Sequence, residues 1–296
     1  MLNFRPAFCQ RNTALGSPIL LADGRGNMVH TPVMSSDPAA PFHAWFAAYC
    51  RTFDTKHIED LRNLRLKEEH TSRVCDNAVR IAADLHLPVR EALLAEISAL
   101  FHDVGRFPQY QQYKTYRDSA SVNHAALGAS VLLKQDVLRG LPPQEQQTIV
   151  RVVALHNAFA VPPGLDAGIL RLVEIVRDAD KLDIWDVFIE YLAQDPADRP
   201  TAVGLELPDV PEYSEAVMAS LRRREMVRLD SLRTINDFKL LQLAWIYDLN
   251  TPPALRILEE RNIIARLGAT LPANDETSAA IDALHAHVNG RLRTSC

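Results

Sequence analysis

The stretch "ISALFHDVGRF", from Ile97 to Phe107, ends an apolar helical pattern with a histidine placed beside an aspartate. Burying either side chain without a partner costs free energy, because each gives up its hydrogen bonds to water. The adjacent pair His102-Asp103 therefore predicts that other parts of the chain supply partners for it.

From Pro41 onward, segments with helical periodicity follow one another with only short breaks. The segment from His57 to Leu85 repeats buried-type residues at intervals of three and four, which predicts one long helix. The segment after the pair, "VGRFPQYQQYKTYRDSAS", lacks this period, and we expect a polar loop. No run shows the alternation of β-branched residues that is typical of strands, so the sequence predicts an all-α fold.

Composition restricts the partners and the location of the protein. A formal net charge of -5 and the lack of a basic stripe argue against binding to a nucleic-acid polymer. The longest uncharged run in the middle, "VVALHNAFAVPPGL", is 14 residues long and contains prolines, so no membrane span is expected.

The four cysteines are widely spaced without a C-x-x-C pair, which indicates free thiols. With no secretion signal in the sequence, we expect a cytoplasmic protein, and the sequence is compatible with a homo-oligomer.

Four of the ten histidines lie inside apolar helical patterns, and two aspartates accompany them. These residues are His70, His102, Asp103, His124, His156 and Asp180. One buried histidine is usually satisfied within the core, but four histidines and two carboxylates on five successive helices are hard to satisfy independently. A shared metal centre satisfies all of them, and imidazole with carboxylate suits manganese, iron, nickel or zinc.

The order of these residues resembles the HD-domain superfamily of metal-dependent phosphohydrolases. The resemblance covers about residues 60–190 and rests on His70, on the pair His102-Asp103 with its "HDVG" turn, and on Asp180 in "RDADKLD". It implies an HD-domain helical bundle with additional C-terminal helices, in which these four residues bind a divalent metal.

Some members of this superfamily hold two ions, with two further histidines and with the aspartate of the pair as a bridge. His124 and His156 fall in the matching places, so we expect a binuclear site. The alternative is a single ion, with these two histidines lining the pocket and contacting phosphate.

The resemblance implies a hydrolase that cleaves a phosphoester, in a nucleotide or another small phosphorylated metabolite, with a metal-activated water. The expected catalytic residues are Asp103 as the bridge, Asp180 to orient the water, and Arg106 to contact phosphate. Lys114 and Arg117 are further candidates for substrate binding, or else belong to a solvated loop face. The region after His156 lacks the Gly-Tyr-Pro motif of members that hydrolyse cyclic di-guanylate, so that activity is not expected.

The same set of residues is also compatible with two other functions. An HD-fold group of di-iron oxygenases, which includes myo-inositol oxygenase, uses the same ligand set, so ligand identity does not separate hydrolysis from oxygen-dependent cleavage. A non-catalytic metal- or nucleotide-binding regulatory module is the third interpretation. Asp183, three residues after Asp180, is expected either to support a ligating histidine or to pair with Lys181 or Arg177 on the helix surface.

Three parts are expected along the 296 residues. Residues 1–40 are rich in turn formers, which predicts a poorly ordered leader. Residues 41–195 are expected to form the metal-binding HD domain. Residues 196–296 are expected to form a C-terminal helical extension that packs on this core.

Overall fold

The computed structural model describes residues 21–22, 28–29, 37–195, 199, 203–205 and 207–294. The chain divides into two units, Met1–Ala40 and Pro41–Cys296. In the first unit, the two-residue strands β1 (Leu21–Ala22) and β2 (Met28–Val29) pair in antiparallel orientation. Most of the leader that was predicted for residues 1–40 lies outside the described residues.

The second unit is built from helices, which confirms the predicted all-α class. In chain order they are α1 (Ala40–Arg51), α2 (Ile58–Asp84), α3 (Val89–Phe101), α4 (Arg106–Tyr113), α5 (His124–Gln135), α6 (Pro143–Leu155), α7 (Ala167–Ala193), α8 (Glu215–Arg222), α9 (Ile235–Ala244), α10 (Pro252–Glu260), α11 (Ile263–Gly268) and α12 (Asp275–Thr294). Short 3-10 turns lie at Asp118–Ala120, Leu229–Ser231 and Trp245–Asp248.

Helix α3 is a core helix of the second unit, because every residue from Leu93 to Phe101 is buried. It has no exposed face in this stretch, where even Glu96 and Ser98 are buried, and it packs against α2, α6 and α7. Helix α2 buries the face that its period predicts, which includes His70, Val74, Ala78 and Ile81. The apolar run of α3 therefore delivers the His102-Asp103 pair into the interior.

The segment that was predicted to be a polar loop after Asp103 contains helix α4, so the loop prediction was wrong for Arg106–Tyr113. This helix has eight residues, which is too short to show a clear period. Its buried side chains Phe107 and Tyr110 lie three residues apart, on one face. Pro108 falls in the first turn, where the missing N–H of proline breaks no helical hydrogen bond.

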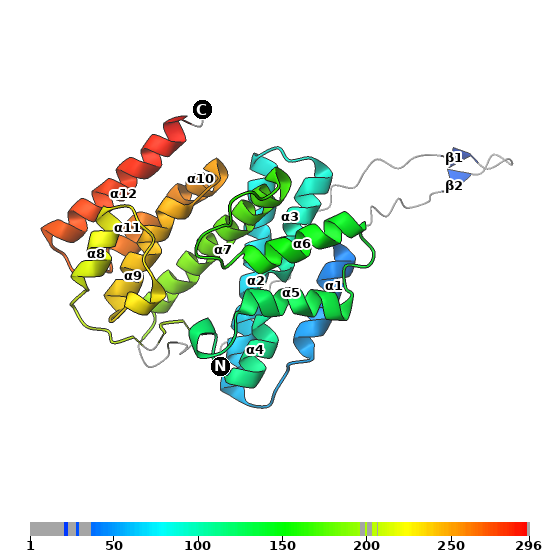
Figure 1. Cartoon of the computed structure of the whole chain (residues 1–296), viewed down its shortest axis with the longest axis horizontal. Helices are drawn as coiled ribbons and strands as arrows, with labels where there is room; N and C mark the ends of the chain where they lie inside the picture. The colour runs from blue at the N-terminus through cyan, green and yellow to red at the C-terminus, as the bar shows by residue number, and fades with distance from the viewer. Residues whose placement is uncertain are drawn as a thin grey trace. The chain divides into compact units, whose positions relative to one another are not determined.

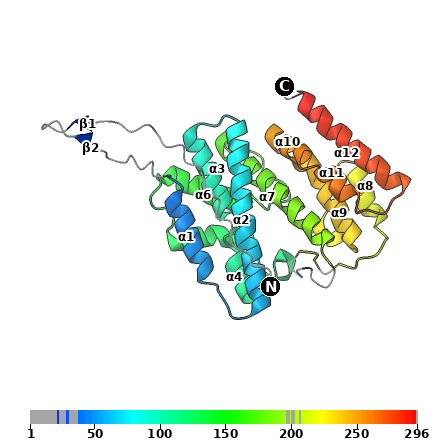
Figure 2. The ribbon, with the colours of Figure 1, turned by 180° about the vertical axis from the view of Figure 1, so that it is seen from behind.

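Helix α7 lies between the C-terminal helices α8–α12 and the helices α1–α6, as Figures 1 and 2 show from opposite sides. Asp178 on α7 accepts hydrogen bonds from the backbone N–H and the hydroxyl of Thr251, both at 2.8 Å. Arg177 and Lys181 each donate to the carboxylate of Asp248 at 2.7 Å. The polar residues of α7 thus fix the segment that leads into α10.

The composition led to two expectations, one for the cysteines and one for membrane-spanning helices. Cys50 and Cys75 are buried and form no disulfide, which confirms the prediction of free thiols for these two residues. Cys9 and Cys296 lie outside the described residues. None of the helices in the described part of the chain combines the length and the low polarity that crossing a bilayer requires.

Asp178→Ala should lower the free energy of unfolding by about 2–4 kcal/mol, because the backbone N–H groups of Asn250 and of the buried Thr251 lose their acceptor. Urea denaturation of the purified protein measures this change. The control is Asp282→Ala, at an exposed position on α12, which should change stability by less than about 0.5 kcal/mol. An Asp178 variant as stable as this control would contradict the assigned role.

Candidate metal centre

The six residues predicted to bind metal come together in the interior, from five different helices or their ends. We call them the six-residue cluster: His70 on α2, His102 and Asp103 after α3, His124 at the start of α5, His156 after α6, and Asp180 on α7. They form two groups, and within each group the candidate ligand atoms lie within 4.8 Å of one another.

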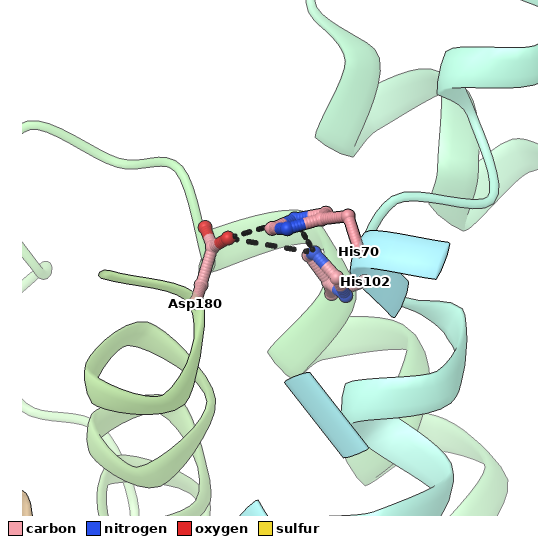
Figure 3. A group of neighbouring side chains, drawn as sticks. All are labelled: His70, His102 and Asp180. Atoms are coloured by element: carbon pink, nitrogen blue, oxygen red, sulfur yellow. Dashed lines mark hydrogen bonds and ion pairs between the residues drawn. The ribbon is translucent and has the colours of Figure 1, made fainter. Parts of the chain in front are cut away.

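The first group consists of His70, His102 and Asp180, and Figure 3 shows the carboxylate reaching from α7 toward the two rings. Oδ1 of Asp180 lies 3.1 Å from Nε2 of His70 and 3.7 Å from Nε2 of His102. The two ring nitrogens are 3.3 Å apart. Oδ1 of Asp180 is buried and makes no hydrogen bond within the described structure, so this oxygen needs another partner.

The second group consists of His124, His156 and Asp103. Oδ1 of Asp103 lies 3.3 Å from Nε2 of His124 and 3.8 Å from Nε2 of His156. The other oxygen of Asp103, Oδ2, lies 3.6 Å from Nε2 of both His70 and His102. Asp103 therefore presents a separate oxygen to each pair of histidines.

Two of the histidines are oriented by backbone carbonyls. Nδ1 of His102 lies 2.7 Å from the carbonyl oxygen of Ala99, and Nδ1 of His156 lies 2.7 Å from that of Val153. A carbonyl oxygen can only accept, so Nδ1 carries the proton in each ring. Nε2 of each neutral ring then points a lone pair into the cluster.

The other two histidines are oriented by carboxylates. Nδ1 of His70 lies 2.6 Å from Oδ2 of Asp183, which also accepts from Arg73. Nδ1 of His124 lies 2.7 Å from Oδ2 of Asp118. Carboxylates of this kind commonly fix the tautomer of a metal-binding histidine. The contact also confirms that Asp183 supports a histidine, which was one of the two interpretations of this residue.

Four ring nitrogens and the oxygens of two carboxylates therefore turn acceptor atoms toward one another. Facing lone pairs repel unless a cation or a proton lies between them. Each group offers three nitrogen and oxygen ligand atoms, and the carboxylate of Asp103 faces both groups. Such ligands suit one divalent transition metal in each group. The residues present thus fit the metal that the sequence implies.

The protonation states in this interior match the forms that bind metal. Burial lowers the pKa of His102 and His124, and burial with the neighbouring histidines lowers the pKa of His156 to about 3. Burial raises the pKa of Asp103, but Lys67 and His102 outweigh it and hold the pKa well below its usual range. Neutral imidazole and ionised carboxylate are the forms that coordinate a cation.

His70 is the exception among the four histidines. Burial and Lys67 lower its pKa, but Asp180 and Asp183 outweigh them, so that its pKa is raised overall. A proton on Nε2 would compete with a metal ion for the same lone pair. Metal binding in the first group should therefore weaken as the pH falls through this raised pKa.

Residues 68–185 match the family model of the HD domain. The chain contains an HD domain. This confirms the resemblance seen in the sequence, and the matched range encloses the whole six-residue cluster. HD domains characterise a superfamily of metal-dependent hydrolases. Comparisons with curated proteins and with solved structures found no match.

The glycine of the "HDVG" turn lets two helices of the HD domain approach closely. A Cβ atom on Gly105 would lie 2.2 Å from the carbonyl oxygen of His124 and 2.5 Å from the backbone nitrogen of Gly128. Real Cβ atoms do not approach backbone atoms so closely, so only glycine fits here. The turn after Asp103 is thereby packed against the first turn of α5, next to His124.

Arg106, the predicted phosphate contact, has one of its two terminal nitrogens engaged within the protein. One terminal nitrogen donates to Asp118 at 2.8 Å and to the carbonyl of Tyr116 at 2.6 Å. Its Nε lies 3.4 Å from Oδ1 of Asp103 without a hydrogen bond. In this arrangement Arg106 holds Asp118, the carboxylate that orients His124.

Lys114 and Arg117 lie outside the six-residue cluster. Lys114 donates to Asp60 at 2.6 Å, and Asp60 precedes His70 by ten residues on α2, or about 15 Å along the helix. Arg117 is exposed. Their contact with a substrate stays a prediction.

Two residues around the cluster were missed from the sequence. Lys67 donates to Oδ2 of Asp103 at 2.8 Å, and its position three residues before His70 on the same helix face was a usable signal. Asp118 lies in a segment without a helical period, so nothing in the sequence marked it as the partner of His124.

Gly105→Ala should destabilise the HD domain by about 1–3 kcal/mol, because the backbone of α5 must move away from the added methyl group. Thermal or urea unfolding measures the change. Gly140→Ala is the matched control, since a Cβ there meets no atom within 4 Å. Equal stability of the two variants would show that the close approach at Gly105 is not required.

Asp183→Ala should weaken metal binding about 10–100-fold at one of two sites and leave the other nearly unchanged, because only His70 loses its orienting carboxylate. Calorimetric titration with Mn²⁺ or Zn²⁺ resolves the two sites. Asp186→Ala, one turn further along α7, is the control, because Asp186 pairs with Arg261 and Arg266 instead. Loss of both sites, or of neither, would contradict the assignment.

Proposed function

We propose that this HD domain is a metal-dependent phosphohydrolase, which cleaves a phosphoester of a nucleotide or another small phosphorylated metabolite. The six-residue cluster holds two divalent ions, of manganese, iron, nickel or zinc. The observation that carries the proposal is the two-sided placement of Asp103, whose oxygens face the His70–His102 pair at 3.6 Å and His124 at 3.3 Å.

When bound, two such ions lower the pKa of a water molecule and neutralise phosphoryl oxygens, which together meet the needs of phosphoester cleavage. The protein's part is to hold the ligands rigidly. Each imidazole is locked through Nδ1, and Asp103 spans both groups. Such fixed donors need little reorganisation during the reaction.

Asp180 marks the side from which water and substrate approach. Its side chain is 19% exposed, whereas the side chains of the other five residues of the cluster are at most 5% exposed. Its buried Oδ1 makes no hydrogen bond within the described structure. We assign Asp180 a second role besides metal binding, which is to accept a hydrogen bond from the attacking water and orient it.

The depth of the cluster favours a small substrate over a polymer. Among the described residues that contact the cluster, Asp180, Lys67 and Arg106 have side-chain exposures of 15–19%, and Asp118 beside His124 is 29% exposed. A phosphoryl group at the end of a small molecule can reach such buried ligands more easily than the backbone of a nucleic acid can. The absence of a basic stripe in the sequence agrees with this choice.

Protein loaded with Mn²⁺ and kept under strict exclusion of oxygen should release phosphate from at least one ester in a panel of phosphorylated metabolites. Asp103→Ala should reduce this release to background and lose most of the bound metal in elemental analysis, because both groups lose their shared ligand. Circular dichroism should show that the helices of the variant remain.

Other results would assign a different function. Turnover that requires both iron and dioxygen would place the chain with the di-iron oxygenases of the same fold. A protein that binds two ions but transforms no substrate, with or without oxygen, would act as a binding module. Full metal content and activity in Asp103→Ala would overturn the central assignment.

A further inference from the structure

Lys67 lies at the edge of the six-residue cluster. Metal binding there would change the charge that surrounds its ammonium group. Its Nζ donates to Oδ2 of Asp103 at 2.8 Å and lies 5.5 Å from the centre of the Tyr116 ring. Among the described residues, Asp103 is the only hydrogen-bond acceptor that contacts this ammonium group. The side chain is 17% exposed, close to the value for Asp180, so it also reaches the open side.

The other cations around the cluster are neutralised by carboxylates that do not bind metal. Arg73 pairs with Asp183 at 2.6 Å, and Arg106 pairs with Asp118 at 2.8 Å. Arg106 also lies 3.4 Å from Asp103, but Lys67 differs from both arginines because, among the described residues, the proposed metal ligand Asp103 is its sole carboxylate partner. Once two ions share the carboxylate of Asp103, the charge of Lys67 has no carboxylate left to balance it.

A count of charges then distinguishes two classes of phosphoester. Two divalent ions carry four positive charges, of which Asp103 and Asp180 neutralise two and an attacking hydroxide neutralises one. The remaining charge balances a phosphodiester, which carries a single negative charge. A phosphomonoester is a dianion above a pH of about 6 and needs one more positive charge. The ammonium group of Lys67 supplies this one additional positive charge beside the cluster.

We propose that Lys67 contacts the substrate phosphoryl group and makes the site selective for phosphomonoesters over phosphodiesters. This inference rests on the proposed phosphohydrolase function with two ions. The ammonium has three N–H donors and uses one for Asp103, so two can reach a phosphoryl oxygen on the open side.

Lys67→Gln tests the charge directly, because glutamine keeps a donor toward Asp103 and removes the positive charge. Lys67→Met is a second neutral variant in case one of them folds poorly, and Lys67→Arg keeps the charge. Lys134→Gln, at an exposed position on α5, is the matched control. The probes are p-nitrophenyl phosphate, a monoester, and bis-p-nitrophenyl phosphate, a diester, at pH 8 with Mn²⁺.

In the neutral variants, kcat/KM for the monoester should fall about 100-fold, while kcat/KM for the diester falls less than about 5-fold. Lys67→Arg should restore most of the preference, and the control should match the wild type. Calorimetry provides a readout besides activity. The neutral variants should still bind two Mn²⁺ ions, and the manganese-loaded variants should bind inorganic phosphate about 10–100-fold more weakly than the wild type.

An equal loss for both esters, loss of metal from the neutral variants, or unchanged phosphate binding would overturn the role of Lys67. Loss of metal would show that Lys67 only balances the charge of Asp103. Unchanged phosphate binding would show that Lys67 does not contact phosphate. Failure of the proposed function is a separate result: the wild type would bind two ions and hydrolyse neither ester. In that case phosphate binding alone decides whether Lys67 recognises a phosphoryl dianion.

Discussion

The structure depends on one buried carboxylate that faces two pairs of imidazoles. Asp103 directs Oδ2 toward His70 and His102, and Oδ1 toward His124 and His156. Because each imidazole donates through Nδ1 to a carbonyl or carboxylate, only acceptor atoms converge on Asp103 from these rings. Such an arrangement is unfavourable in an apolar interior unless cations lie within it.

The helices around Asp103 supply the rigidity that this arrangement requires. The fully buried end of α3 carries the aspartate into the interior, and Gly105 lets the following turn pack directly on α5. On the opposite side, α7 presents Asp180 to the cluster, while Asp178 binds the segment that leads into α10. The C-terminal helices therefore stabilise the helix that carries one of the ligands.

Much of this could be predicted from the sequence, because buried polar residues stand out against a helical period. The long helix through His70, and the convergence of the six residues, follow from apolar faces that must pack together. The partners of Lys67 and of Asp118 could not be predicted in the same way. Lys67 meets Asp103 across 36 positions of sequence, at a crossing of α2 with the end of α3 that periodicity does not specify. Asp118 meets His124 from an irregular segment.

The most direct test of the account is anomalous diffraction from crystals soaked in Mn²⁺. The account predicts two strong peaks about 3.5–4 Å apart, one beside His70, His102 and Asp180, and the other beside His124 and His156. Asp103 should lie between the peaks, with one oxygen directed to each. A single peak at saturating Mn²⁺, or two peaks that do not share Asp103, would contradict it.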